Sequence, residues 1–221
     1  MIGQIGVSFP STYGYARRYI SKNYPYLLED GPDATPIDLD DLKEYLRVDP
    51  ADTVEDAYLE SLIRAATIWG EKYCRRDFIT KTYTTYRDDF SGSCFQLQKS
   101  PFIELNSFEY LKDGVLTPVN PATYYMKITN DFSSIYRKIN TNWPLDADIQ
   151  LQTIKISFDA GYGDAAEDVP DDLRMALMQH CAALYENRGD CDSGDCGKGL
   201  PAGAKIIYDQ YRILSITTEP Y

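Results

Sequence analysis

The sequence predicts an α+β fold: a mainly helical bundle of about four helices, with an inserted antiparallel β-region. Two changes of hydrophobic period predict it. Apolar residues recur at helical spacing over 37–80 and again over 165–214. Between these segments, over 81–164, the period falls to two and short strands follow one another closely. Residues 1–36 show no sustained period and are expected to form an N-terminal arm, and 215–221 a polar C-terminal tail.

Two helices are expected before the β-region. Asp38 can cap the first, which carries leucines on one face. Thr53 is expected to cap the second, whose apolar residues recur every 3.6 positions as far as about Cys74. Arg75 and Arg76 then lie at the negative end of the helix dipole, where cations are favourable.

Turn and alternation signals place the strands of the β-region. Asp113-Gly114 is a strong signal for a two-residue hairpin between Lys112 and Val115. Short, closely spaced strands favour an antiparallel sheet or small sandwich over parallel crossover units. The strands are expected over 80–85, 95–98, 108–112, 124–128, 134–139 and 153–159, and two further helices over 171–188 and 200–211.

Composition and charge exclude several classes of protein. Among 221 residues, 34 are acidic and 22 are Lys or Arg, which gives a net charge of −12. This balance argues against a free-standing duplex-DNA binder, which needs cations to displace phosphate counterions. No apolar run is long enough for a membrane span, and the N-terminus has no signal-peptide stretch. Five irregularly spaced cysteines do not form a secreted disulfide framework, so we expect a reducing cytosol.

No motif assembles a catalytic, cofactor or metal site. One set of candidate zinc ligands exists: His180, Cys181, Cys191 and Cys196. His180 and Cys181 are adjacent in a helix and diverge by ~100°, a poor start for one tetrahedron, so His180 is expected in a core or interface with one hydrogen bond. The stretch 190–195 lacks the glycine and glutamate positions of a calcium loop. We therefore expect a non-enzyme without cofactor or metal.

The order of short motifs is more specific than any one of them. Over about residues 37–213, the series closely resembles the head–tail connector (neck adaptor) family of tailed bacteriophages. The motifs that carry the resemblance are LDDLKEYLRVD (39–49), EDAYLESLIRAA (55–66), YCRRDFIT (73–80), PATYY (121–125), ISFDAGYG (156–163), VPDDLRMAL (169–177), LYENR (184–188), LPAGA (200–204) and YR (211–212).

The resemblance implies a structural virion protein of the phage neck, assembled in the host cytoplasm. Members form a homo-oligomeric ring, typically twelve-fold, beneath the portal protein. The ring prolongs the DNA channel and presents a surface to downstream neck and tail proteins. DNA is expected to pass without specific binding, and an acidic or neutral channel wall would keep that binding weak. The 1–36 arm and the Cys/Asp-rich loop 190–199 depart from the family pattern.

The C-terminal segment is predicted to dock on the portal. Its last helix has more apolar surface than a solvated terminal helix needs, and the polar tail suits an extended peptide in a groove. The alternative is that this helix packs on its own bundle and the tail is disordered. The candidate docking residues are Ile207, Tyr211, Arg212, Ile213, Leu214 and Tyr221.

Three other functions stay open at this point. A neck stopper or tail-completion protein is the nearest rival within the virion. A small metal-dependent enzyme would need zinc for folding or activity. An acidic regulatory binding protein would act as a monomer or dimer and would not assemble on a portal.

Overall fold

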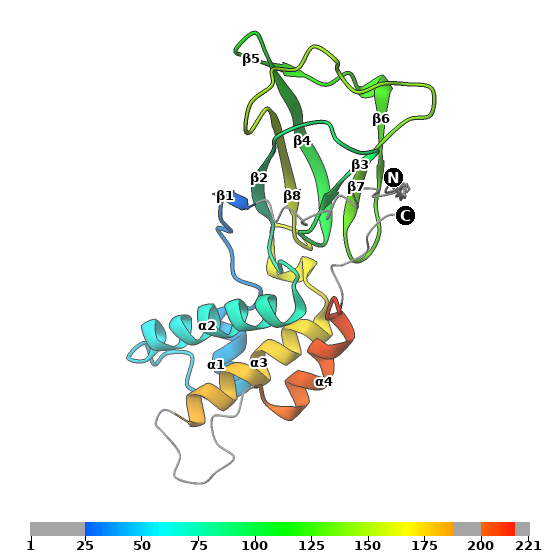
Figure 1. Cartoon of the computed structure of the whole chain (residues 1–221). Helices are drawn as coiled ribbons and strands as arrows, with labels where there is room; N and C mark the ends of the chain where they lie inside the picture. The colour runs from blue at the N-terminus through cyan, green and yellow to red at the C-terminus, as the bar shows by residue number, and fades with distance from the viewer. Residues whose placement is uncertain (1–24, 188–199, 215–221) are drawn as a thin grey trace, which may run out of the picture.

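The computed structural model describes residues 25–187 and 200–214 as a helical region and a β-region joined end to end (Figure 1). The helices are α1 (Leu39–Leu46), α2 (Asp56–Cys74), α3 (Asp171–Glu186) and α4 (Ala202–Tyr211), with two short 3₁₀ turns, η1 (Pro121–Thr123) and η2 (Ala166–Asp168). The strands are β1 (Tyr26–Asp30), β2 (Lys81–Arg87), β3 (Cys94–Leu97), β4 (Phe102–Lys112), β5 (Val115–Pro118), β6 (Tyr124–Lys127), β7 (Ser133–Arg137) and β8 (Ile154–Ala160).

The mixed α+β class is confirmed, but the mainly helical emphasis is not. Within the described residues, strands are about as common as helices. One reason is that β4 begins at Phe102, six residues before the strand expected from 108. Its pairing with β8 is irregular between Phe102 and Glu104 and again between Leu105 and Ser107. These irregularities break the two-residue alternation by which a strand is recognised in a sequence.

All strand pairs are antiparallel and form two sheets. The larger sheet has the order β1-β2-β8-β4-β5 and the smaller one the order β3-β7-β6. The predicted hairpin is confirmed: Lys112 pairs with Val115, and Asp113 and Gly114 have φ values of 51° and 77°. Positive φ at both central residues is the geometry that Asp-Gly favours. β1 lies within the predicted arm and adds an edge strand to β2.

The helices begin and end near the predicted positions, but neither predicted side-chain cap forms. Asp38 is at the N-cap position of α1 and makes no side-chain cap hydrogen bond. α2 starts at Asp56 with Glu55 as its N-cap, so Thr53 does not cap it. The Asp52 carboxylate instead accepts the Val54 N–H at 3.0 Å, which keeps the chain in a turn before the helix starts. At the other end, Arg75 adopts a left-handed conformation with φ 59°, and α2 stops there.

Each region has its own buried core. In the helical region, apolar faces of α1 and α2 pack with those of α3 and α4, and Tyr208 is the largest fully buried side chain. The β-region is mostly aromatic inside: Phe90 stacks on Trp143 with ring centroids 5.5 Å apart, and both contact Phe95. Two separate cores mean that the contacts at the junction decide how the regions are held together.

None of the helices described here is long and apolar enough to cross a membrane.

Gly161 marks a close approach of two backbone segments at this junction. It has φ 150° and follows β8, against the backbone of Thr80 just before β2. A Cβ at Gly161 would lie 2.6 Å from the Thr80 Cα, which no real Cβ contact allows. The Gly161 N–H donates to the Pro101 carbonyl at 2.8 Å, so the glycine fastens the ends of three strands together.

Candidate functional site

The predicted docking residues lie at the end of α4, and most of them contact their own chain. Tyr211 donates its hydroxyl hydrogen to the Asp172 carboxylate at 2.7 Å. Arg212 places its guanidinium over the Tyr73 ring, 4.7 Å from the centroid. Ile213 is 4% exposed and donates its N–H to the Cys74 carbonyl at 3.0 Å. The alternative that α4 packs on its own bundle therefore holds for this part of the chain.

Two apolar side chains of this segment remain available to a partner. Leu214 is 81% exposed, immediately after the buried Ile213. Ile206 is 65% exposed on the outer face of α4, whereas Ile207 is half-buried against the helical core. Tyr221, the last predicted docking residue, lies outside the described residues.

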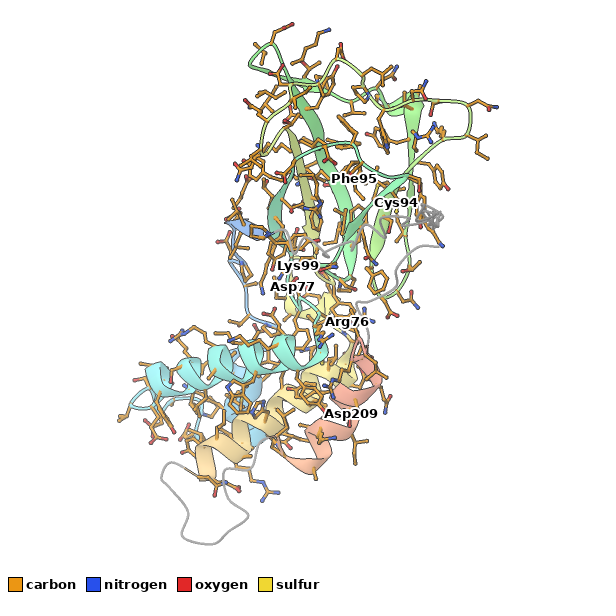
Figure 2. The ribbon with its side chains drawn as sticks, in the orientation of Figure 1. Arg76, Asp77, Cys94, Phe95, Lys99 and Asp209 are labelled. Carbon is orange, nitrogen blue, oxygen red and sulfur yellow. The ribbon has the colours of Figure 1, made fainter. Side chains whose placement is uncertain are left out.

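Arg76 connects four segments where the helical region meets the β-region. Its Nε donates to the Tyr211 carbonyl at 2.7 Å, at the end of α4. One terminal nitrogen donates to the Ser100 hydroxyl at 3.0 Å and to the Asn130 carbonyl. The other pairs with the Asp131 carboxylate at 3.1 Å. Figure 2 shows Arg76 at this junction, close to Asp77 and Lys99.

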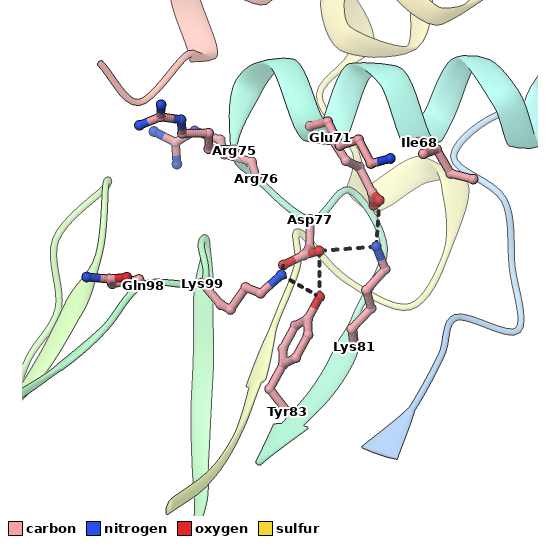
Figure 3. A pocket seen from close by; sticks show the side chains of 10 residues that line it. Ile68, Glu71, Arg75, Arg76, Asp77, Lys81, Tyr83, Gln98 and Lys99 are labelled. Atoms are coloured by element: carbon pink, nitrogen blue, oxygen red, sulfur yellow. Dashed lines mark hydrogen bonds and ion pairs between the residues drawn. The ribbon is translucent and has the colours of Figure 1, made fainter. Parts of the chain in front are cut away.

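A network of buried charges lies beside Arg76 (Figure 3). Lys81 pairs with Glu71 at 2.6 Å and with Asp77 at 3.1 Å, and its side chain is only 12% exposed. The Tyr83 hydroxyl donates to Asp77 at 2.8 Å, and the Lys99 ammonium lies 3.1 Å from that hydroxyl. Such a network fixes the direction in which β2 leaves α2, because each buried charge requires its partner.

Burial and ion pairing shift the pKa values of Glu71 and Lys81 in opposite directions. Burial raises the pKa of Glu71 and outweighs the lowering by Lys81. Burial lowers the pKa of Lys81, but the carboxylates of Asp77 and Glu71 outweigh it, so the pKa lies above its usual range. Lys81 is therefore an ammonium at neutral pH. Burial, together with the Asp77 carboxylate, also raises the pKa of Tyr83, which keeps its hydroxyl a donor.

This network forms one wall of a surface cleft of about 370 Å³, which we call the basic cleft. Its rim carries Lys72 and Arg75, neither of which has an anionic partner among the residues described. In a chain of net charge −12, this cation excess is local. The lining is Ile68, Glu71, Lys72, Arg75, Arg76, Asp77, Lys81, Tyr83, Gln98 and Lys99, which includes five cations against two carboxylates.

Of the candidate zinc ligands, His180 and Cys181 lie in the described part of the chain. His180 is 3% exposed in the helical core, as predicted, with its ring near Trp69 and Tyr208. Its Nδ1 has no hydrogen-bond partner there, so the one bond expected is not made at that atom, and burial lowers its pKa. Over 25–187 and 200–214, no three His, Cys, Asp or Glu side chains form a metal-binding group. Cys191, Cys196 and the stretch 190–195 lie outside these ranges.

Comparison with known families matches one segment of the chain. Residues 36–100, which include α1, α2, β2 and β3, match the model of the phage gp6-like head–tail connector proteins. The resemblance to the head–tail connector family expected from the sequence is therefore supported over this segment. No curated protein sequence gave a significant match.

Solved structures share the fold of this chain over most of its length. A chain from the neck of an empty gene transfer agent (GTA) particle, computed with C6 symmetry, superposes with a TM-score of 0.72 at 20% identity and covers 88% of this chain and 98% of its own. A chain from the virion of a native GTA particle, with the same identity and coverage, gives 0.67. A chain from the native neck, computed with C12 symmetry, gives 0.65 at 19% identity.

Sequence reasoning found the helix that ends at this junction but missed the junction itself. Arg75 and Arg76 were both assigned to the helix dipole, although Arg76 alone crosses to the β-region. Neighbouring arginines give no signal that separates them. The left-handed turn at Arg75 does so, because it directs the two side chains to different surroundings.

Proposed function

We propose that this chain is a head–tail connector and forms a closed homo-oligomeric ring of twelve copies beneath the portal protein of a tailed phage. The ring prolongs the DNA channel and joins the head to downstream neck and tail proteins, as a non-enzymatic part of the virion neck assembled in the host cytoplasm. The match of residues 36–100 to the connector family carries this proposal. The fold shared with neck chains of particles computed with C6 and C12 symmetry supports it.

The charge of the chain fits a channel through which DNA must slide. A wall that attracted phosphates would hold the duplex, whereas a net charge of −12 keeps binding to it weak. In this proposal, DNA passes through the channel without sequence-specific contact to the ring.

Portal docking is assigned to the end of α4 and the residues after it. Leu214 is the exposed apolar residue there. Ile206, on the outer face of α4, is a second exposed apolar residue. Because Ile213 is buried against the end of α2, it acts by fixing where Leu214 emerges. Ile207, Tyr211 and Arg212 hold α4 in place, and the tail 215–221, with Tyr221, completes the docking segment.

Co-assembly with the portal tests the proposed function. The purified chain, mixed with portal rings, is expected to give a complex with a fixed multiple of copies in native mass spectrometry. A stable two-fold dimer that does not bind portal would overturn the proposal, because an isologous dimer uses up the repeated surface that a ring needs.

A further inference from the structure

The two ends of α2 carry surfaces of opposite charge. Its C-terminal end forms the rim of the basic cleft, with Lys72 and Arg75 exposed. Its N-terminal end follows the α1–α2 loop, residues 47–55, which presents the carboxylates of Asp49 and Asp52. In Figure 1 this loop lies at the end of α2 remote from the β-region, whereas the C-terminal end of α2, which carries cleft residues, lies next to the β-region.

The α1–α2 loop is held in a fixed shape before it meets any partner. The Lys43 side chain is 3% exposed and pairs with Asp56 at 2.5 Å. Its ammonium also donates to the Asp52 carbonyl at 3.0 Å and to the Pro50 carbonyl at 3.4 Å. The Asp49 carboxylate accepts the Ala51 N–H at 2.9 Å, which closes the turn. A preformed loop loses little conformational entropy on binding.

The loop and the cleft match each other in polarity as well as charge. Val54, two residues after Asp52 in the loop, is 88% exposed. Ile68, at the cleft, is 49% exposed beside Lys72 and Arg75. Figure 3 shows Ile68 and Arg75 on either side of the buried network. Each surface thus offers one apolar side chain flanked by charges, with the signs reversed between them.

A copy cannot fill its own cleft with its own loop. The nineteen residues of α2 span about 28 Å at 1.5 Å per residue, and the two surfaces lie at its opposite ends. Contact between them therefore requires a second copy and is head-to-tail, the type of interface that repeats until a ring closes.

We propose that the α1–α2 loop of one copy docks into the basic cleft of the next copy in the ring. The proposal rests on the proposed function and adds the pair of surfaces through which the copies touch. The helix dipole explains why charges within the first and last turns of α2 have these signs. It does not explain two exposed apolar side chains at the same places, nor the carboxylate of Asp49, which lies well before the helix begins.

Two charge-reversed variants test the contact. The cleft variant carries Lys72→Glu and Arg75→Glu. The loop variant carries Asp49→Asn and Asp52→Asn, which keep the hydrogen bonds of the turn, with Ala51→Lys and Thr53→Lys to make the loop basic. Lys127→Glu with Lys138→Glu is a control in the β-region with the same charge change as the cleft variant. Circular dichroism and thermal melting establish that each variant is folded.

Ring formation on portal is measured for each variant alone and for the mixture. Each reversed variant alone places like charges in contact and is expected to lose at least nine-tenths of its ring occupancy, while the control forms rings as the wild type does. The mixture restores rings, because cleft and loop variants alternate with opposite charges at every contact. Rings of wild-type level from each variant alone, or none from the mixture of folded variants, would overturn this contact. Wild-type protein that forms no ring would refute the proposed function instead.

Discussion

Replacing Arg76 by alanine is expected to lower the free energy of unfolding by about 3 kcal/mol. The guanidinium makes three hydrogen bonds to neutral oxygens, of Tyr211, Ser100 and Asn130, and each contributes about 1 kcal/mol net. Its ion pair with Asp131 adds less than about 1 kcal/mol, since that carboxylate is 59% exposed and solvent screens it. For a chain of this size, the sum corresponds to a fall in melting temperature of about 6–12 °C.

Arg75 provides the matched control for this measurement. It precedes Arg76, is exposed and has no partner among the described residues, so Arg75→Ala is expected to change stability by less than about 0.5 kcal/mol. Differential scanning calorimetry of both variants compares the two directly. If both variants melt within about 2 °C of the wild type, Arg76 does not hold the regions together as its contacts indicate.

Five further outcomes are expected. Gly161→Ala should destabilise the fold by more than about 2 kcal/mol in chemical denaturation, because its methyl group would meet the Thr80 backbone; wild-type stability would show that the turn is not as tight as described. Burial raises the pKa of the Cys74 and Cys181 thiols to about 12, so iodoacetamide at pH 8 should leave both unlabelled in native protein, as peptide mass mapping would detect. The unfolded thiols ionise near pH 9, so above that pH the unfolded state loses protons that the folded state keeps; stability measured by urea titration should fall from pH 8 to pH 10, and a rise would contradict the assignment. Free protein should bind duplex DNA with a Kd no tighter than about 10⁻⁵ M at physiological salt in a mobility shift, and sub-micromolar binding would contradict the weakly binding channel. Removing 215–221 together with Leu214→Ser should leave helix content unchanged and reduce recruitment to portal-bearing heads at least tenfold. The same removal with Leu214 kept should have a smaller effect. If both truncated proteins occupy heads at the wild-type level, the docking site lies elsewhere.

Local signals predicted those parts of the fold that depend on neighbouring residues. The hairpin at Asp113-Gly114 was found because both residues tolerate positive φ, and α2 because its apolar face recurs regularly. The sequence places the cap of α2 at Thr53, because Thr is a residue that commonly caps a helix. In the structure, the turn at Asp52 delays the start of α2 to Asp56. The division into arm, helical bundle, β-region and tail stays a prediction.

The parts that the sequence did not reveal depend on distant contacts. β1 forms because residues 26–30 pair with β2, more than fifty positions later in the chain. The basic cleft exists because the segment between β3 and β4 returns to the end of α2, which brings Lys99 to Asp77. Five cations scattered over 72–99 give no pattern until the chain is folded. The net charge of −12 gives no indication of this local excess of cations.

Electron microscopy of the purified chain bound to portal tests the central claim most directly. The account predicts a closed ring on the portal, coaxial with its channel, in which the α1–α2 loop of each copy reaches the basic cleft of its neighbour. A portal without added density, or density for isolated two-fold dimers, would contradict it.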